Sequence, residues 1–163
     1  MPNMQTIRAG VAELPKGSPL VVALTGGTTG IGSYIANELA KTFAKHGSKL
    51  RVYVVGRNAQ RAEAVLKFGR ETSPGSDWQF IQATDLSLIS EVDSVSAEII
   101  KREEASPFAG GPPRLDVLYM SQARSPMAES KREYIPTSLS LSRKPKMLHV
   151  YFFIFFIFRP TQN

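Results

Sequence analysis

The sequence predicts an α/β fold built on a doubly wound parallel sheet with the strand order 3-2-1-4. Three observations predict it: apolar strand-like runs alternate with amphipathic segments of helical length, the first run ends in a glycine-rich turn, and the 163 residues suffice for one domain with a buried core. Strands joined through helices pair in parallel, and such crossovers are right-handed. The alternation stops near residue 123, so we expect the C-terminal half of the sheet to be incomplete.

The expected elements follow one another along the chain. Residues 1–19 form a lead-in with a short helix, because Ile7, Val11 and Leu14 recur at helical spacing before Pro15. Strands are expected at residues 20–24, 50–55, 78–83 and 115–120, and helices at residues 30–45, 58–69 and from residue 88 onward.

Two helices carry residue patterns that predict how they pack. The first of them has an apolar stripe that should lie on the sheet, formed by Ile31, Ile35, Leu39 and Phe43. In the last helix, Leu88, Val92, Val95 and Ile99 recur at helical spacing, which predicts the helix itself. Its acidic residues, Asp93, Glu98, Glu103 and Glu104, are expected on a solvated face.

Composition argues against several functional classes. The chain has no cysteine, which rules out disulfides, thiolate metal sites and a cysteine nucleophile, and its two histidines, His46 and His149, argue against a histidine metal site. Thirteen basic and 12 acidic residues precede position 123, whereas 7 basic and 2 acidic residues follow. Most of the net charge of +6 therefore belongs to the tail, and no nucleic-acid partner is expected. The start lacks a secretory apolar segment, so we expect a cytoplasmic protein.

A strand, a glycine-rich turn and a helix start come together in residues 20–32. The first backbone N–H groups of a helix have no partner within the helix, and the helix dipole places partial positive charge there. A dinucleotide pyrophosphate can therefore bind at this point. The candidate cofactor-binding residues of this segment are Thr25, Gly26, Thr28, Thr29, Gly30, Ile31 and Gly32.

The spacing T-G-x-x-x-G-x-G, in Thr25, Gly26, Gly30 and Gly32, resembles the cofactor motif of the short-chain dehydrogenase/reductase family. On spacing alone the segment also fits an ordinary flexible turn, but the strand before it and the amphipathic helix after it favour the cofactor motif. The resemblance implies a Rossmann-type fold and an oxidoreductase that moves hydride between a nicotinamide dinucleotide and a carbonyl or alcohol.

The end of the second strand favours NADP(H) over NAD(H). The resemblance places an acidic residue here in NAD-specific members, whereas this chain has Gly56 followed by Arg57 and Asn58. A guanidinium can pair with the 2′-phosphate of NADP(H), although a solvated surface arginine would look the same in the sequence. Asn58 is also a suitable helix cap.

Two later segments complete the resemblance. After the third strand, Asp85 and Leu86 stand where the family contacts the adenine ring, and Asp85 would equally serve as a helix N-cap. After the fourth strand, where the family usually has Asn-Asn-Ala-Gly, this chain has Met120, Ser121, Gln122 and Ala123. Ser121 and Gln122 are therefore candidates for the nicotinamide ribose, without the side-chain hydrogen bonds of the asparagines.

The catalytic pair of the family is missing from the sequence. Its reaction uses a tyrosine general acid with a lysine four residues later, and none of the five tyrosines is followed by such a lysine. We therefore predict no catalytic residue and little turnover, with a carbonyl or alcohol substrate only for a longer form. The alternatives are a non-catalytic NADP(H)-binding module and a nonfunctional truncated gene product.

Residues 124–163 are expected to form an irregular tail. The apolar run at residues 147–158 is shorter than the roughly 20 residues of a transmembrane helix and has no polar face, which argues against a membrane partner. One hypothesis is that the sequence after about residue 123 is not native to the family; the other is that the run pairs with the fourth strand and shields its edge. The chain thus divides into the lead-in 1–19, an NAD(P)-binding domain at 20–123 and this tail.

Overall fold

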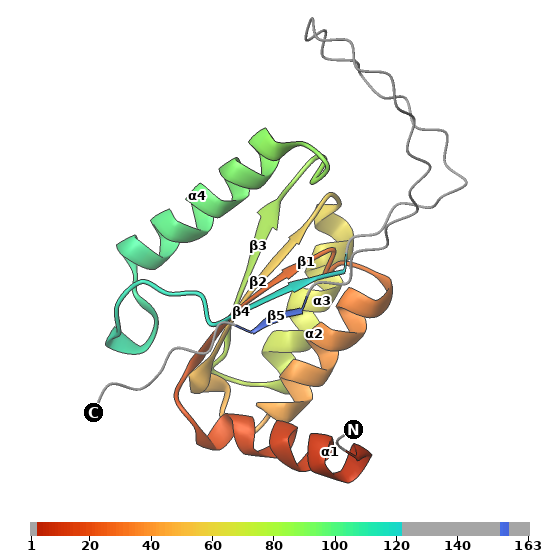
Figure 1. The fold of residues 1–163 in the computed structure, drawn as a ribbon, viewed down its shortest axis with the longest axis vertical. Coiled ribbons are helices and arrows are strands. Elements are labelled where there is room, and N and C mark those ends of the chain that lie inside the picture. Colours follow the sequence, from red (N-terminus) through yellow and green to blue (C-terminus); the bar gives the residue numbers. More distant parts are fainter. Residues whose placement is uncertain (1–2, 122–153, 157–163) are drawn as a thin grey trace, which may run out of the picture.

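The structure is a computed structural model that describes residues 3–121 and the backbone of residues 154–156 (Figure 1). Its helices are α1 (Met4–Glu13), α2 (Gly30–Thr42), α3 (Ala59–Thr72) and α4 (Ile89–Ala105), with short 3-10 turns at Leu14–Lys16, Gly47–Lys49 and Phe108–Gly110. Its strands are β1 (Leu20–Thr25), β2 (Leu50–Gly56), β3 (Asp77–Gln82), β4 (Val117–Met120) and β5 (Ile154–Phe156). None of the helices in this part of the chain is long and apolar enough to cross a membrane.

The sheet has the order β3-β2-β1-β4-β5, which confirms the predicted 3-2-1-4 arrangement. The first four strands are parallel, with Val22 paired to Val52 on one side and to Val117 on the other. Strand β5 pairs antiparallel with β4, as the second hypothesis for the apolar run anticipated. The rest of that run lies outside the described residues.

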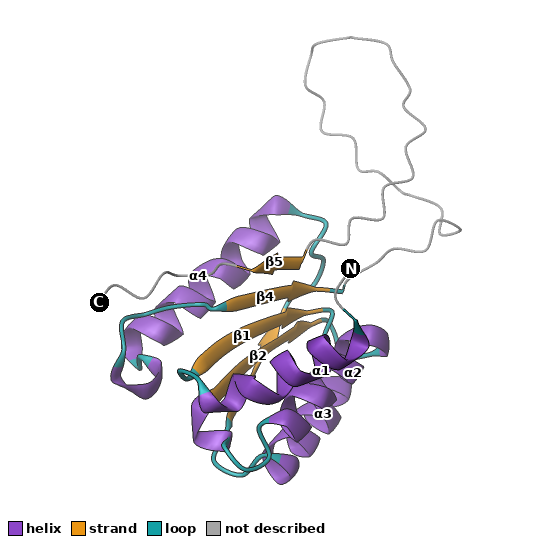
Figure 2. Ribbon diagram, turned by 60° about the horizontal axis from the view of Figure 1, so that its bottom comes forward, coloured by secondary structure: helices purple, strands orange, loops and turns teal. Residues whose placement is uncertain are grey.

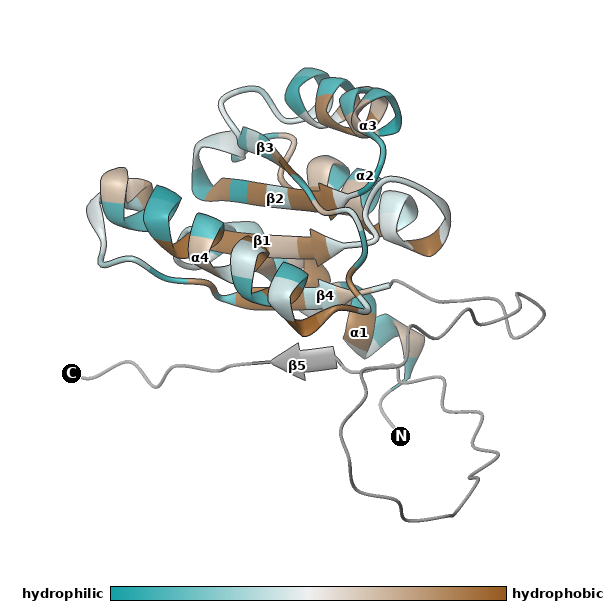
Figure 3. Ribbon diagram, turned by 90° about the horizontal axis from the view of Figure 1, so that it is seen from above, coloured by the Kyte–Doolittle hydropathy of each residue, from teal (hydrophilic) through white to brown (hydrophobic). Residues whose placement is uncertain are grey.

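Helices cover both faces of the sheet, α2 and α3 on one face and α4 on the other (Figures 2 and 3), and each face buries a separate core. Successive side chains of a strand point to opposite faces, so Val22 and Leu24 of β1 face α2 and α3, whereas Val21 and Ala23 face α4. The first core adds Ala36, Ala40, Phe43, Leu50, Val52, Val54, Val65, Leu66 and Trp78, and the second adds Tyr53, Val55, Ile81, Ala83, Val95, Ile99 and Phe108.

Two helices differ from the expectation. Helix α2 ends at Thr42, three residues early, and Ile31 at its start is 56% exposed, so it does not pack on the sheet as predicted. Helix α3 continues past Gly69, which was expected to end it. A Cβ at Gly69 would overlap the Trp78 ring, so the glycine lets the helix approach β3 closely.

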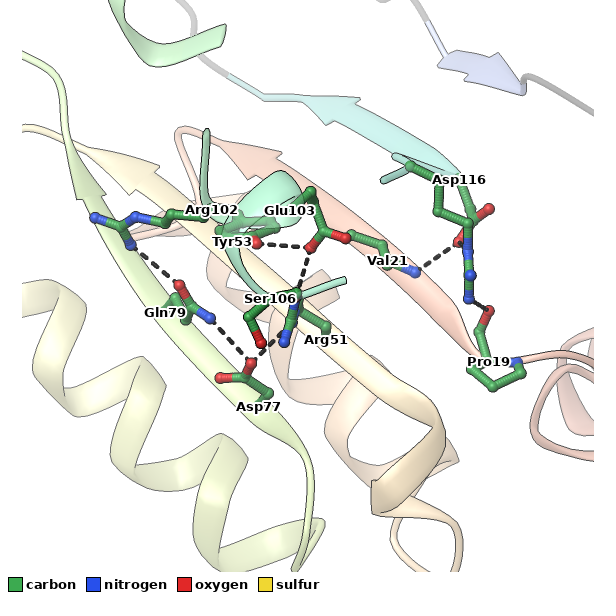
Figure 4. Close-up of polar contacts among 11 residues, drawn as sticks. Pro19, Val21, Arg51, Tyr53, Asp77, Gln79, Arg102, Glu103, Ser106 and Asp116 are labelled. Atoms are coloured by element: carbon green, nitrogen blue, oxygen red, sulfur yellow. Dashed lines mark hydrogen bonds and ion pairs between the residues drawn. The ribbon is translucent and has the colours of Figure 1, made fainter. Parts of the chain in front are cut away.

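Glu103 is 2% exposed, so the prediction that it lies on a solvated helix face is wrong. Its Oε1 accepts hydrogen bonds from Arg51 Nη1 at 2.8 Å and from Tyr53 Oη at 2.7 Å (Figure 4). Arg51 also pairs with Asp77 at 2.8 Å, and its guanidinium lies 4.8 Å from the Phe108 ring centroid. The buried carboxylate thus fastens α4 to β2.

The pKa values of the two donors reflect this pairing. Burial, helped by the hydrogen bond to Glu103, raises the pKa of the Tyr53 hydroxyl above its ordinary value. Burial alone would lower the pKa of Arg51, but the hydrogen bond to Glu103 and the charges of Asp77 and Glu103 raise it overall. At neutral pH the cluster therefore holds a charged arginine and an un-ionised tyrosine.

We expect Glu103→Ala to lower the free energy of unfolding by about 3 kcal/mol, because it leaves the Arg51 charge buried beside one fewer carboxylate. Urea unfolding followed by circular dichroism measures this change. The exposed neighbour provides the control, Glu104→Ala, which should unfold close to wild type. Equal midpoints for both variants would contradict a stabilising role for the cluster.

Candidate functional site

The candidate site lies where the parallel strands end, at the carboxyl edge of the sheet. Open α/β sheets bind ligands at this edge, near the point where the strand order reverses. Here β1 is that point, because the chain continues from β1 to β2 and β3 on one side and returns to β4 on the other. The predicted glycine-rich turn follows β1. It therefore lies between the side of the sheet that carries β2 and β3 and the side that carries β4.

The turn between β1 and α2 has the backbone geometry that its glycines predict. Gly26 has φ 71° and Gly30 has φ 57°, a left-handed conformation that glycine adopts without strain. The Gly26 N–H donates to Val55 O at 3.0 Å, which ties the turn to β2. Thr29 is the N-cap of α2, and its side chain makes no capping hydrogen bond, so the N–H groups of the first helical turn lack a side-chain acceptor there.

Gly32 and Ser121 close the turn tightly. A Cβ at position 32 would overlap the Gly26 carbonyl oxygen and Ser121 Oγ, so only glycine fits. Ser121 Oγ lies 3.0 Å from Thr25 O and 3.2 Å from Gly26 O, and the Ser121 N–H donates to Thr25 O at 2.9 Å. Ser121 was predicted as a ribose contact; the structure shows in addition that it joins the end of β4 to the turn.

At the end of β2, Gly56 and Thr28 are packed against one another. A Cβ at position 56 would lie 2.6 Å from Thr28 Cγ2, so Thr28 occupies the space where another residue type would place a side chain. Arg57 and Asn58 follow and are exposed at the same edge. Asn58 caps α3 as predicted, since its Oδ1 accepts a hydrogen bond from the Arg61 N–H at 2.9 Å.

At the end of β3, Asp85 and Leu86 form part of a turn that leads into α4. Asp85 Oδ1 accepts hydrogen bonds from the Ser87 N–H at 3.0 Å and the Ser87 hydroxyl at 2.7 Å. The N-cap of α4 is Leu88, so Asp85 stands three residues before the cap and does not cap the helix. Leu86 is half-buried against the core beneath α4.

In the described part of the chain, the glycine turn lies at the same edge of the sheet as the ends of β2, β3 and β4. No tyrosine with a lysine four residues later lies beside it there. Among these residues, no group of three or more His, Asp or Glu side chains could hold a metal ion. Tyr53 is buried in the Glu103 cluster, and Tyr34 is exposed on α2. Gln122, the last predicted site residue, lies outside the described part of the chain.

Fold and turn together define a class: a parallel α/β protein with a dinucleotide-type glycine turn at the switch point of its sheet. No family profile matches the chain. It is 66% identical over 123 residues to the short-chain dehydrogenase/reductase SAT2 of Stachybotrys chartarum, a match that covers 76% of this chain and 35% of the relative. The chain belongs to the short-chain dehydrogenase/reductase family.

Two further matches also cover only about a third of the matched protein. The NmrA-like family domain-containing oxidoreductase notO of an Aspergillus species is 35% identical over 120 residues, covering 72% of this chain and 32% of the relative. Among solved structures, an actinorhodin polyketide ketoreductase variant with NADPH is 28% identical, has a TM-score of 0.48, and is matched over 64% of this chain and 33% of its own. The chain thus spans about a third of the length of the curated relatives it matches.

The tight closure at Gly32 leads to a prediction. We expect Gly32→Ala to lower the free energy of unfolding by about 1–3 kcal/mol, because the methyl group must displace the Gly26 carbonyl or the Ser121 hydroxyl. Thermal melting measures the loss. The control is Gly10→Ala on exposed α1, where a Cβ meets no atom within 4 Å and alanine favours the helix. Indistinguishable melting of Gly32→Ala and wild type would refute the tight closure.

Proposed function

We propose that this protein binds a nicotinamide dinucleotide at the β1–α2 turn, with NADP(H) favoured over NAD(H). The observation that carries the proposal is the turn itself: two glycines with positive φ, a third without room for a side chain, and a helix start without a side-chain cap. This arrangement presents backbone N–H groups and partial positive charge to a pyrophosphate.

In this proposal each predicted residue has a place along the dinucleotide. The pyrophosphate lies on the turn formed by Thr25, Gly26, Thr28, Thr29, Gly30, Ile31 and Gly32. Arg57 and Asn58 hold the 2′-phosphate, Asp85 and Leu86 lie beside the adenine, and Ser121 and Gln122 lie beside the nicotinamide ribose. The exposure of Ile31, unexplained by packing on the sheet, suits a residue that a bound cofactor covers.

The preference for NADP(H) rests on the end of β2. Thr28 fills the space beside Gly56, so an acidic side chain cannot be accommodated there without moving the turn. Arg57, the next residue, is exposed and can pair with a phosphate through two parallel hydrogen bonds. The positive charge would attract the 2′-phosphate, which a carboxylate at this place would repel.

We further propose that the activity belonging to this platform, in a longer form that carries the catalytic pair, is hydride transfer between NADP(H) and a small carbonyl or alcohol, in the cytoplasm. The support is the 66% identity to a relative named a short-chain dehydrogenase/reductase, together with three other relatives named oxidoreductases. The sequence contains no Tyr-x-x-x-Lys, which favours a second candidate: a module that binds NADP(H) without turning it over.

Arg57→Ala tests the cofactor proposal. We expect the variant to bind NADPH about 10- to 100-fold more weakly while its affinity for NADH changes little, because the removed hydrogen bonds to a charged group reach only the 2′-phosphate. Isothermal titration calorimetry with both cofactors measures this. Arg61→Ala, an exposed arginine on α3, is the matched control. Equal losses for NADPH and NADH would show that Arg57 does not select the phosphate.

A turnover assay separates the two candidate functions. We expect the purified chain to bind NADPH but to oxidise it with a panel of carbonyl compounds no faster than the uncatalysed background, because no tyrosine–lysine pair is available as general acid. NADPH absorbance at 340 nm follows the reaction. Enzyme-dependent oxidation would instead favour an active oxidoreductase, and a chain with no cooperative melt and no NADPH binding would favour a nonfunctional gene product.

A further inference from the structure

Strand β3 forms one edge of the sheet, because the strand order of the described residues places only β2 beside it (Figure 1). Backbone groups of an edge strand that point away from the sheet have no strand to pair with, and they can bind a strand of another molecule. The six residues of β3 include Trp78, Phe80 and Ile81, and Asp77 is its only charged residue. Aromatic and β-branched residues favour strands, so this edge is suited to pairing unless something covers it.

The hydrogen bonds of β3 show which of its backbone groups face outward. The Ala83 N–H, directly after the strand, donates to Gly56 O at the end of β2 at 3.0 Å. In a strand, the N–H and C=O of one residue point to the same side, and this side alternates from residue to residue. Every second residue from Ala83 back to Asp77 therefore bonds toward β2. The carbonyl groups of Trp78 and Phe80 point to the free edge.

Two arginine side chains bind these two outward carbonyl groups. Arg70 Nη2 donates to Trp78 O at 3.0 Å, and Arg102 Nη1 donates to Phe80 O at 3.2 Å. Arg70 belongs to α3 and Arg102 to α4, and these helices cover opposite faces of the sheet. The two guanidinium groups therefore reach the edge of β3 from both faces and occupy successive outward acceptors.

Further contacts hold each arginine in this position. Arg102 Nε donates to Glu98 Oε1 at 2.7 Å, and its Nη1 also donates to Gln79 Oε1 at 3.2 Å (Figure 4). Arg70 Nη1 lies 3.6 Å from Glu63 Oε1. Ion pairs near the surface add little stability on their own. The main consequence of these pairs is therefore the position of the two arginines.

We propose that Arg70 and Arg102 close the free edge of β3 against strand addition, and that the partner they exclude is β3 of a second copy of this chain. An added strand must donate its own N–H groups to Trp78 O and Phe80 O, which the arginines already occupy. It would also press its backbone against two positive charges and remove them from water. Two copies of one edge can pair antiparallel about a two-fold axis, so a second copy always offers a matching strand.

Removal of both arginines tests the proposal. We expect the double variant Arg70→Ala/Arg102→Ala to associate at a concentration at least about tenfold lower than wild type, because the outward carbonyl groups of β3 become available. Size-exclusion chromatography with light scattering over a dilution series measures this. The matched control is Lys67→Ala/Lys101→Ala, which removes two positive charges from exposed positions of the same helices and should behave as wild type. Equal association of the two double variants would overturn the proposal, and so would an arginine variant that behaves as wild type.

A proline at the same edge distinguishes strand pairing from loss of folding. Gln82→Pro removes an N–H group that points away from β2, so the ladder between β2 and β3 is kept. We expect the double arginine variant to return to the wild-type state when Gln82→Pro is added, because proline cannot donate to an added strand. Circular dichroism melting shows which variants fold, and a folded triple variant that still associates would refute β3 as the contact.

A single substitution keeps the test decisive where the double variant does not fold. Arg70 is 50% exposed, so Arg70→Ala alone removes one edge contact with little cost to the core. We expect this variant to associate at a lower concentration than wild type and Lys67→Ala to match wild type. An Arg70→Ala variant that associates no more readily than Lys67→Ala would contradict the role of Arg70 at the edge.

Discussion

Strand β1 is buried on both faces and bonded to a strand on each side, and the other features of the protein depend on that position. Its alternate side chains divide into the two cores, so a shift of one residue would exchange them. Side chains from the β4 segment hold it at both ends: Asp116 accepts from the Val21 N–H at 2.8 Å, and Ser121 holds the Thr25 carbonyl. The glycine turn therefore begins at the end of a strand that is held at both ends by hydrogen bonds to the β4 segment.

The two faces of the sheet are held by different forces. Helices α2 and α3 are held by apolar packing, which the close approach of Gly69 to the Trp78 ring tightens. Helix α4 has several exposed apolar residues and is fastened at its far end by the buried Glu103. An ion pair of this kind specifies one arrangement by its directional hydrogen bonds, although its net stabilisation is smaller than its Coulomb energy suggests. Arg102 of α4 adds directional contacts to β3, because its Nη1 donates to Gln79 Oε1 and to Phe80 O at 3.2 Å.

Features that depend on neighbouring residues could be predicted from the sequence, and features that depend on distant partners could not. The order of the four parallel strands, the glycine turn and the Asn58 cap follow from local patterns. Glu103 was misplaced because its partner Arg51 is 52 residues away and the helix pattern around it resembles a solvated face. One signal was available: an arginine within an apolar strand needs a buried carboxylate. The bond from Ser121 to the turn, 96 residues away, left no such signal.

Contacts from the ends of neighbouring strands shape the glycine turn. Within the described residues, Val55 orients Gly26, Thr28 fills the space at Gly56, and Ser121 closes the turn against α2. Proton transfer to a substrate, by contrast, requires an acid positioned beside the nicotinamide, and the described part of the chain places no tyrosine with a lysine four residues later at that edge. The glycine turn and the tyrosine–lysine pair are thus separate features, and this sequence carries the first without the second.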